Sequence, residues 1–247
     1  MFLFQSPPPT RFDLNFSLFE IPVRVHPMFW FLAALLGFGS GQVLIWVFVV
    51  FFSILIHEMG HALAFRRYGQ DSHIVLHFAG GLTIPESLRW GGGYASVSLS
   101  ANQQIFISLA GPFAGFVLAG LVVGGVIFSG GEIAVNLLFG IIPIPQLTFL
   151  PFGNNAVQVL IVMLLWVNVF WGLINLLPVF PLDGGQVARN FLIQLDPLDG
   201  ARKSLWLSTI TGGVVAVAAF VLLGSFYMAF LFGLLAFQSY QALSGRF

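Results

Sequence analysis

The sequence predicts an all-α polytopic membrane protein, with about six transmembrane helices and a small membrane-associated β-sheet on the cytoplasmic side. Of its 247 residues, 58% are hydrophobic and only 7% are charged, whereas ordinary globular domains have roughly 25% charged residues. The mean hydropathy is +0.95, and several apolar runs reach the length of about 20 residues that a helix needs to cross a bilayer. These observations exclude an ordinary soluble domain.

Charge and cysteine content narrow the classes of partner and metal site. Nine basic and nine acidic residues give no net charge, so the chain cannot form the basic surface that nucleic-acid binding requires, and no nucleic acid is expected as a partner. The chain has no cysteine, so histidine and carboxylate side chains must hold any transition metal that it binds.

Six apolar segments are expected to cross the membrane as helices, within one transmembrane domain that covers residues 1–247. The first segment is short, and the other five have the length of a full span. The predicted spans are residues 26–39, 43–65, 105–128, 156–177, 205–223 and 226–243.

The basic residues test this count independently of hydropathy. With six spans, all nine Lys and Arg residues fall on the same side of the membrane, whereas omitting the first span would divide them between both sides. By the positive-inside rule, both termini are therefore cytoplasmic. The expected location is the cell membrane, with the chain as a multi-pass integral protein.

The cytoplasmic segment 66–102 is expected to be rich in β-structure. Residues 73–78 and 95–100 alternate in the pattern typical of strands, and glycine pairs and triplets punctuate them. Residues 16–25 are expected to add an edge strand. On the opposite side of the membrane, residues 129–155 are expected to form only a loop.

The second span ends with the strongest chemical signal in the chain, His57-Glu58-Met59-Gly60-His61. Helical residues four apart lie on one face, so both imidazoles can bind one Zn²⁺ ion while Glu58 reaches a water molecule bound to the metal. An ionisable cluster inside a membrane span is costly, which favours a functional role.

A catalytic zinc site needs a third protein ligand and an open position for water. Asp183 is the candidate, because it stands at the cytoplasmic end of the fourth span while the other aspartates lie in polar stretches. Pro178 and Pro181 exclude a regular helix just before it. The alternative is that Asp183-Gly184-Gly185 forms only a helix-ending turn.

These two motifs resemble those of the site-2 protease family of intramembrane zinc metalloproteases. In that family, HExxH in one transmembrane helix is followed by N-x-x-P-x-x-x-L-D-G, which here covers residues 175–184. Weaker similarities are His26-Pro27, Gly80-Gly81 and Leu109-Ala110-Gly111-Pro112. The resemblance implies one zinc ion per chain with His57, His61 and Asp183 as ligands, Glu58 as the catalytic base, Asn175 beside the substrate carbonyl, and Gly80 and Gly81 as candidates for substrate binding.

Many members of the family carry PDZ or CBS domains, and the interruptions between the spans here are too short for a PDZ domain. The chain is therefore similar to the minimal core division, which includes the sporulation sigma-factor-processing proteases. This division implies that any regulators are separate chains.

The expected function is that of a zinc metalloendopeptidase, which hydrolyses a peptide bond in or near the transmembrane segment of a membrane-anchored protein. The expected partners are this substrate, the lipid bilayer and separate regulatory chains. One alternative is a divalent-metal transporter that uses the same His and Asp residues, although the third, fifth and sixth spans contain no charged residue. A catalytically inactive scaffold is the other alternative, and the complete His, His, Glu and Asp set argues against it.

Overall fold

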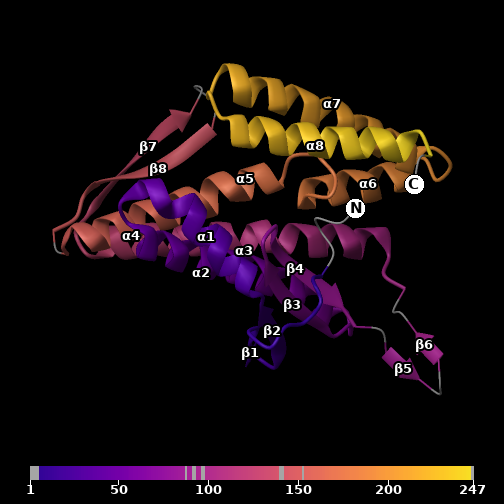
Figure 1. The fold of residues 1–247 in the computed structure, drawn as a ribbon, viewed down its shortest axis with the longest axis horizontal. Helices are drawn as coiled ribbons and strands as arrows, with labels where there is room; N and C mark the ends of the chain where they lie inside the picture. Colours follow the sequence, from indigo (N-terminus) through magenta and orange to yellow (C-terminus); the bar gives the residue numbers. More distant parts are fainter. Residues whose placement is uncertain are drawn as a thin grey trace. The chain divides into compact units, whose positions relative to one another are not determined.

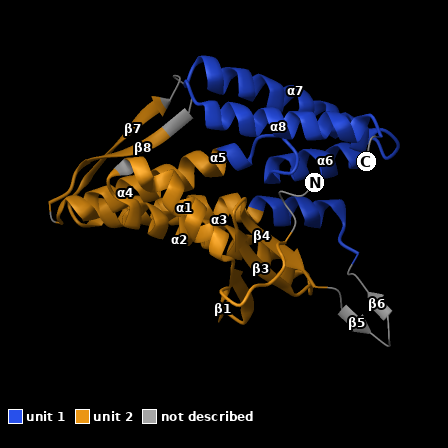
Figure 2. Cartoon of the chain, in the orientation of Figure 1, with its two compact units in different colours: residues 1, 98–109, 174–247 blue, residues 2–97, 110–173 orange. Residues whose placement is uncertain are grey.

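The computed structural model describes residues 6–86, 88–90, 93–95, 98–138, 142–151 and 153–245, and they are mostly helical (Figure 1). The chain divides into two compact units (Figure 2). One unit contains residues 98–109 and 174–247, and the other contains residues 2–97 and 110–173.

Five helical segments among the described residues are long and apolar enough to cross a membrane, and they agree with the five long spans predicted from the sequence. The third is continuous from α4 (Asn155–Trp166) through a π-helical turn, η2 (Val167–Trp171), to α5 (Gly172–Asn175). The five segments are α2 (Val43–Arg67), α3 (Ala101–Phe128), Asn155–Asn175, α7 (Gly200–Val221) and α8 (Phe226–Leu243).

The predicted first span is shorter than the other five. Helix α1 (Pro27–Gly37) has 11 residues, about 16 Å at 1.5 Å per residue, against a hydrocarbon core of ~30 Å. It begins where the ring of His26 accepts a hydrogen bond from the Met28 amide and gives way to a 3-10 turn, η1 (Phe38–Ser40). Its last residue packs so closely on α2 that a Cβ added at Gly37 would lie 2.4 Å from the Trp46 side chain.

A four-stranded sheet packs beside α2. Its strand order is β1 (Leu14–Leu18), β2 (Ile21–Val25), β3 (Ser72–His77), β4 (Gly80–Pro85); β2 and β3 are parallel and the other neighbours are antiparallel. In β3, Ile74, Val75 and Leu76 are each 0% exposed, so both faces of this strand are covered. Ile74 and Leu76 join side chains from α1, α2 and β2 in one hydrophobic core.

The structure confirms one of the strand predictions and corrects the other two. The strand predicted near residues 73–78 is β3. The segment 16–25 is not one edge strand, because a turn at Phe19 and Glu20 divides it between β1 and β2. In the segment 95–100, residue 95 ends β6 (Gly93–Ala95), which pairs with β5 (Leu88–Trp90), but residues 98–100 form no strand because α3 begins directly after them. Residues 96 and 97 lie outside the described part of the chain.

The predicted loop at residues 129–155 is wrong, because it contains a β-hairpin of β7 (Glu132–Leu138) and β8 (Ile142–Phe149). The other unit contains a helix that the sequence did not predict, α6 (Asp183–Leu195), followed by α7 and α8. These last two helices pack closely, since a Cβ at Gly212 would lie 3.1 Å from the Cβ of Ala236.

Candidate metal centre

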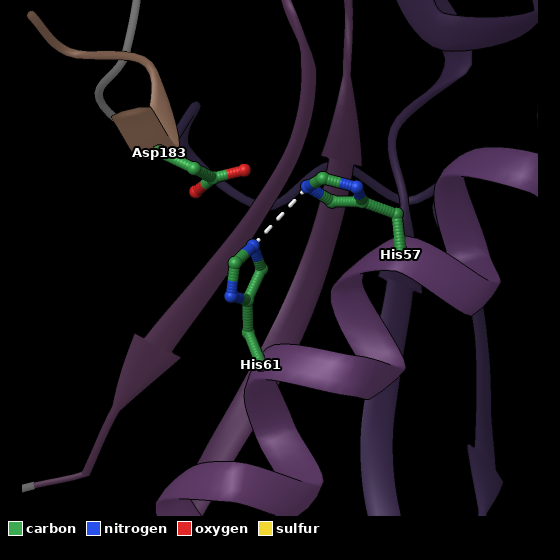
Figure 3. Close-up of side chains that lie close together, drawn as sticks. All are labelled: His57, His61 and Asp183. Carbon is green, nitrogen blue, oxygen red and sulfur yellow. Dashed lines mark hydrogen bonds between the residues drawn. The ribbon is translucent and has the colours of Figure 1, made fainter. Parts of the chain in front are cut away.

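The two histidines of the HExxH motif lie on successive turns of α2, and their rings point toward one another (Figure 3). Their Nε2 atoms are 3.1 Å apart. Two imidazole nitrogens bound tetrahedrally to zinc at roughly 2.0–2.1 Å lie about 3.3 Å apart, so the observed separation fits a shared zinc ion. His61 is buried and His57 is half-buried.

Helix α3 leaves space for these two nitrogen atoms at Gly111. A Cβ at this position would lie 2.2 Å from Nε2 of His61 and 2.8 Å from Nε2 of His57. The two helices also approach closely at Gly60, where a Cβ would lie 2.4 Å from the carbonyl oxygen of Ala110. The bare backbone of α3 thus leaves open the volume that a metal ion on the two histidines requires, and the residues present fit such an ion.

Strand β4 fixes the side chain of Glu58, which is 6% exposed. The hydroxyl of Thr83 lies 2.7 Å from Oε2 of Glu58 and 3.0 Å from its backbone carbonyl oxygen. A Cβ added at Gly81 would lie 2.4 Å from Cγ and from Oε1 of Glu58. The Glu58 side chain therefore lies against β4, with one carboxylate oxygen at the Thr83 hydroxyl.

Asp183 belongs to the other unit, where it is half-buried as the first residue of α6. Helix α5 ends at Asn175, also half-buried, and the backbone between these residues is not helical, as the two prolines predict. The glycines after Asp183 allow this segment to fold back, since a Cβ at Gly184 would lie 2.1 Å from the carbonyl oxygen of Leu176. Like the two histidines, Asp183 offers one ligand atom suited to a metal ion.

A buried serine of α7 holds the non-helical segment in place within its unit. The amide of Phe180 donates a hydrogen bond of 2.8 Å to Oγ of Ser208, which is 2% exposed. Because this bond satisfies a backbone group that no helix serves, it restricts the segment that leads to Asp183.

Sequence reasoning missed Thr83 and the position of Gly111 beside the two histidines. The contact of Thr83 with Glu58 joins residues 25 positions apart, and no local pattern marks it. For Gly111, the available signal was its place in the Leu109-Ala110-Gly111-Pro112 similarity, which does not reveal that it faces the histidines. Gly81 contacts the catalytic-base candidate, and a substrate-binding role for Gly80 and Gly81 stays a prediction.

Comparison with known proteins identifies the family. The family model of peptidase family M50 matches residues 45–218, well over half of the chain. The zinc metalloprotease MJ0392 of Methanocaldococcus jannaschii is 23% identical over 228 residues, which cover 87% of this chain but only 58% of that relative. The solved structure of a site-2 protease from the same organism aligns with 94% of this chain and 95% of its own, with a TM-score of 0.54 and 21% identity, which indicates the same fold. With five helical segments among its described residues that are apolar and long enough to cross a membrane, the chain is an integral membrane protein, and it belongs to peptidase family M50.

Proposed function

We propose that this chain is a zinc metalloendopeptidase that cleaves a membrane-anchored protein in or near its transmembrane segment. The observation that carries the proposal is the arrangement on α2, where two Nε2 atoms 3.1 Å apart adjoin a buried glutamate with a hydrogen-bonded carboxylate. This helix is apolar enough to cross a membrane. A hydrolytic site is therefore built into a transmembrane helix.

His57, His61 and Asp183 are the proposed ligands of one zinc ion per chain. Two imidazoles and a carboxylate are a donor set that suits zinc, and three protein ligands leave one position open. When bound, zinc supplies a Lewis acid that polarises the substrate carbonyl and lowers the pKa of a water molecule.

Glu58 then acts as the general base and afterwards as the general acid. Its carboxylate accepts the proton that the attacking water loses, and it returns this proton to the nitrogen of the leaving amine. The hydroxyl of Thr83 orients the carboxylate by its contact with Oε2. Asn175 is proposed to donate a hydrogen bond to the substrate carbonyl as negative charge develops there.

The substrate is proposed to bind beside β4 as an extended strand. Among the described strands of its sheet, β4 has a neighbour on one side only, so its outer edge is available for a further strand. Gly80 and Gly81 carry no side chain to hinder this approach, and Gly81 lies against Glu58. An unwound substrate segment would thus present its backbone carbonyls next to the base.

The orientation of the chain follows from its basic residues and is part of the proposal. With both termini in the cytoplasm, the zinc motifs lie toward the cytoplasmic leaflet of the cell membrane, and cleavage releases a soluble fragment into the cytosol. Any regulation of this proteolysis comes from separate chains.

The test uses the purified protein in lipid nanodiscs, with Glu58→Gln as the matched variant. We expect the wild type to cleave a membrane-anchored reporter close to its cytoplasmic boundary, which mass spectrometry of the fragments locates. Glu58→Gln should keep its zinc and lose cleavage. A zinc-loaded wild type that transports metal across vesicles but cleaves no reporter would instead favour the transporter, and equal cleavage by the variant would exclude Glu58 as the base.

A further inference from the structure

The hairpin of β7 and β8 has two chemically different faces. The side chains of Asn136 and Gln146 share one face, where the amide of Asn136 donates a hydrogen bond to Oε1 of Gln146 across the strands. The register also places Ala134 and Ile144 on this face, whereas the other face carries apolar residues alone, which pair as Ile133 with Leu147 and Val135 with Pro145. The hairpin therefore has one face with polar side chains and one face that is apolar.

Two β7 residues of the apolar face are exposed, and Pro145 and Leu147 of β8 on the same face are half-buried. Val135 is 63% exposed and Leu137, on the same face of the strand, is 58% exposed. The segment 129–155 contains no basic residue, and its single acidic residue is Glu132. Apolar side chains this exposed in water would oppose folding of the hairpin, so the face requires an apolar surrounding.

Both ends of the hairpin lie within a few residues of a membrane-spanning helix. Helix α3, a membrane-spanning segment, ends at Phe128, which is 96% exposed, and β7 begins four residues later at Glu132. Four extended residues reach at most about 14 Å. At its other end, the hairpin leads within a few residues to α4, the next spanning segment, and Figure 1 shows it running aslant to both helices.

The free edge of β8 is unsuited to pairing with another strand. Pro143 and Pro145 both lie in β8, and proline has no backbone N–H to donate. Since β8 pairs with β7 along its inner edge, these missing donors belong to the outer edge, which is where strands tolerate proline. The face of the hairpin is thus better suited to an interaction than the outer edge of β8.

We propose that this apolar face rests on the acyl chains of the leaflet at the C-terminal end of α3, while the face with Asn136 and Gln146 points toward water. Phe128, the last residue of α3 and four positions before β7, is itself almost fully exposed. Open sheet edges are not stable in the hydrocarbon region, so the backbone lies at the level of the headgroups and only the side chains reach inward. The interaction does not depend on the proposed function.

The absence of cysteine from the chain makes a direct test possible. Val135→Cys and Asn136→Cys place one environment-sensitive fluorophore (NBD) each on neighbouring, exposed positions of β7 that face opposite ways. The full chain is labelled and reconstituted in phosphatidylcholine vesicles, and emission is quenched either by spin-labelled phosphatidylcholine or by aqueous iodide. We expect the label at position 135 to be blue-shifted and several-fold more sensitive to the lipid quencher, and the label at 136 to respond mainly to iodide.

A second pair on β8, Leu147→Cys and Gln146→Cys, repeats the comparison should a variant on β7 fail to fold. Equal lipid quenching of the two faces in either folded pair would overturn the proposal. Shielding of the apolar-face label from both quenchers would also overturn it, because protein would then cover the face.

Discussion

Replacing Gly111 by alanine should lower the zinc affinity of the site while α3, the helix that contains this position, stays folded. The added Cβ would lie 2.2 Å from Nε2 of His61, and ordinary contact begins at 3.4 Å. The ring must therefore retreat by about 1 Å, although ligand positions in metal sites are set to within about 0.2 Å. Changes beside first ligands typically lower metal affinity by about 10- to 100-fold, which is the loss expected here.

The assay separates zinc affinity from folding. Zinc retained against a competing chelator is measured by mass spectrometry, and thermal unfolding is followed on the same sample. Alanine in a helix interior is favoured over glycine by about 1 kcal/mol, which offsets part of the cost of displacing the His61 ring, so the zinc-free variant should remain folded and unfold close to the wild-type temperature.

Gly120→Ala, on the same helix, is the matched control, since no atom lies within 4 Å of a Cβ at that position. It brings the same gain in helix propensity with no contact to the histidines. Wild-type zinc affinity in Gly111→Ala would refute the inference that this glycine holds space for the metal.

Three further predictions follow from named contacts. Thr83→Val should lower kcat by about 10- to 100-fold, equivalent to the ~1.5–3 kcal/mol of a hydrogen bond to a charged group, with zinc content unchanged and activity retained in Thr83→Ser; wild-type kcat in the valine variant would contradict it. Asp183→Ala should lose zinc, because two histidines make an incomplete site, and full occupancy by elemental analysis would reassign the third ligand. Burial raises the pKa of the Asp13 carboxyl, but hydrogen bonds from Thr10 and the ion pair with Arg24 outweigh it and lower the pKa to about 2. Its contribution to stability is present above the usual value of 3.8 and is lost as the pH falls toward 2, so the thermal stability of Asp13→Asn should lie below that of the wild type at pH 6 and converge with it at the acid end.

Local sequence was sufficient to predict a helix or a break in a helix where a few adjacent residues determine it. Helix α8 spans the predicted residues 226–243 because a turn at Gly224, with φ of 59°, precedes it and the side chain of Ser225 caps it. The two prolines after Asn175 likewise predict the non-helical segment before Asp183. In both cases the backbone chemistry of a few adjacent residues determines the outcome.

Elements that depend on contacts distant in sequence were not predictable in this way. The π-helical turn η2 changes the helical phase around Asn168, whose side chain donates a hydrogen bond of 2.9 Å to Ser53 of α2. Helix α6 was missed because only one of its faces is apolar. Its hydropathy therefore resembles that of a polar loop between two membrane spans. The same reason applies to the β7–β8 hairpin, because Asn136 in β7 and Gln146 in β8 interrupt the apolar runs.

Glycines beside the HExxH motif show why sequence could locate the site but not its construction. Their neighbours in the sequence do not show what Gly60, Gly81 and Gly111 contact. In the structure, a Cβ at Gly60 would meet the backbone of Ala110, a fixed obstacle, so this glycine sets the approach of α2 to α3. At Gly81 the obstacle is the side chain of Glu58, and at Gly111 it is the rings of the two histidines. Close packing and functional space thus call for the same residue type for different reasons, and only the tertiary contacts distinguish them.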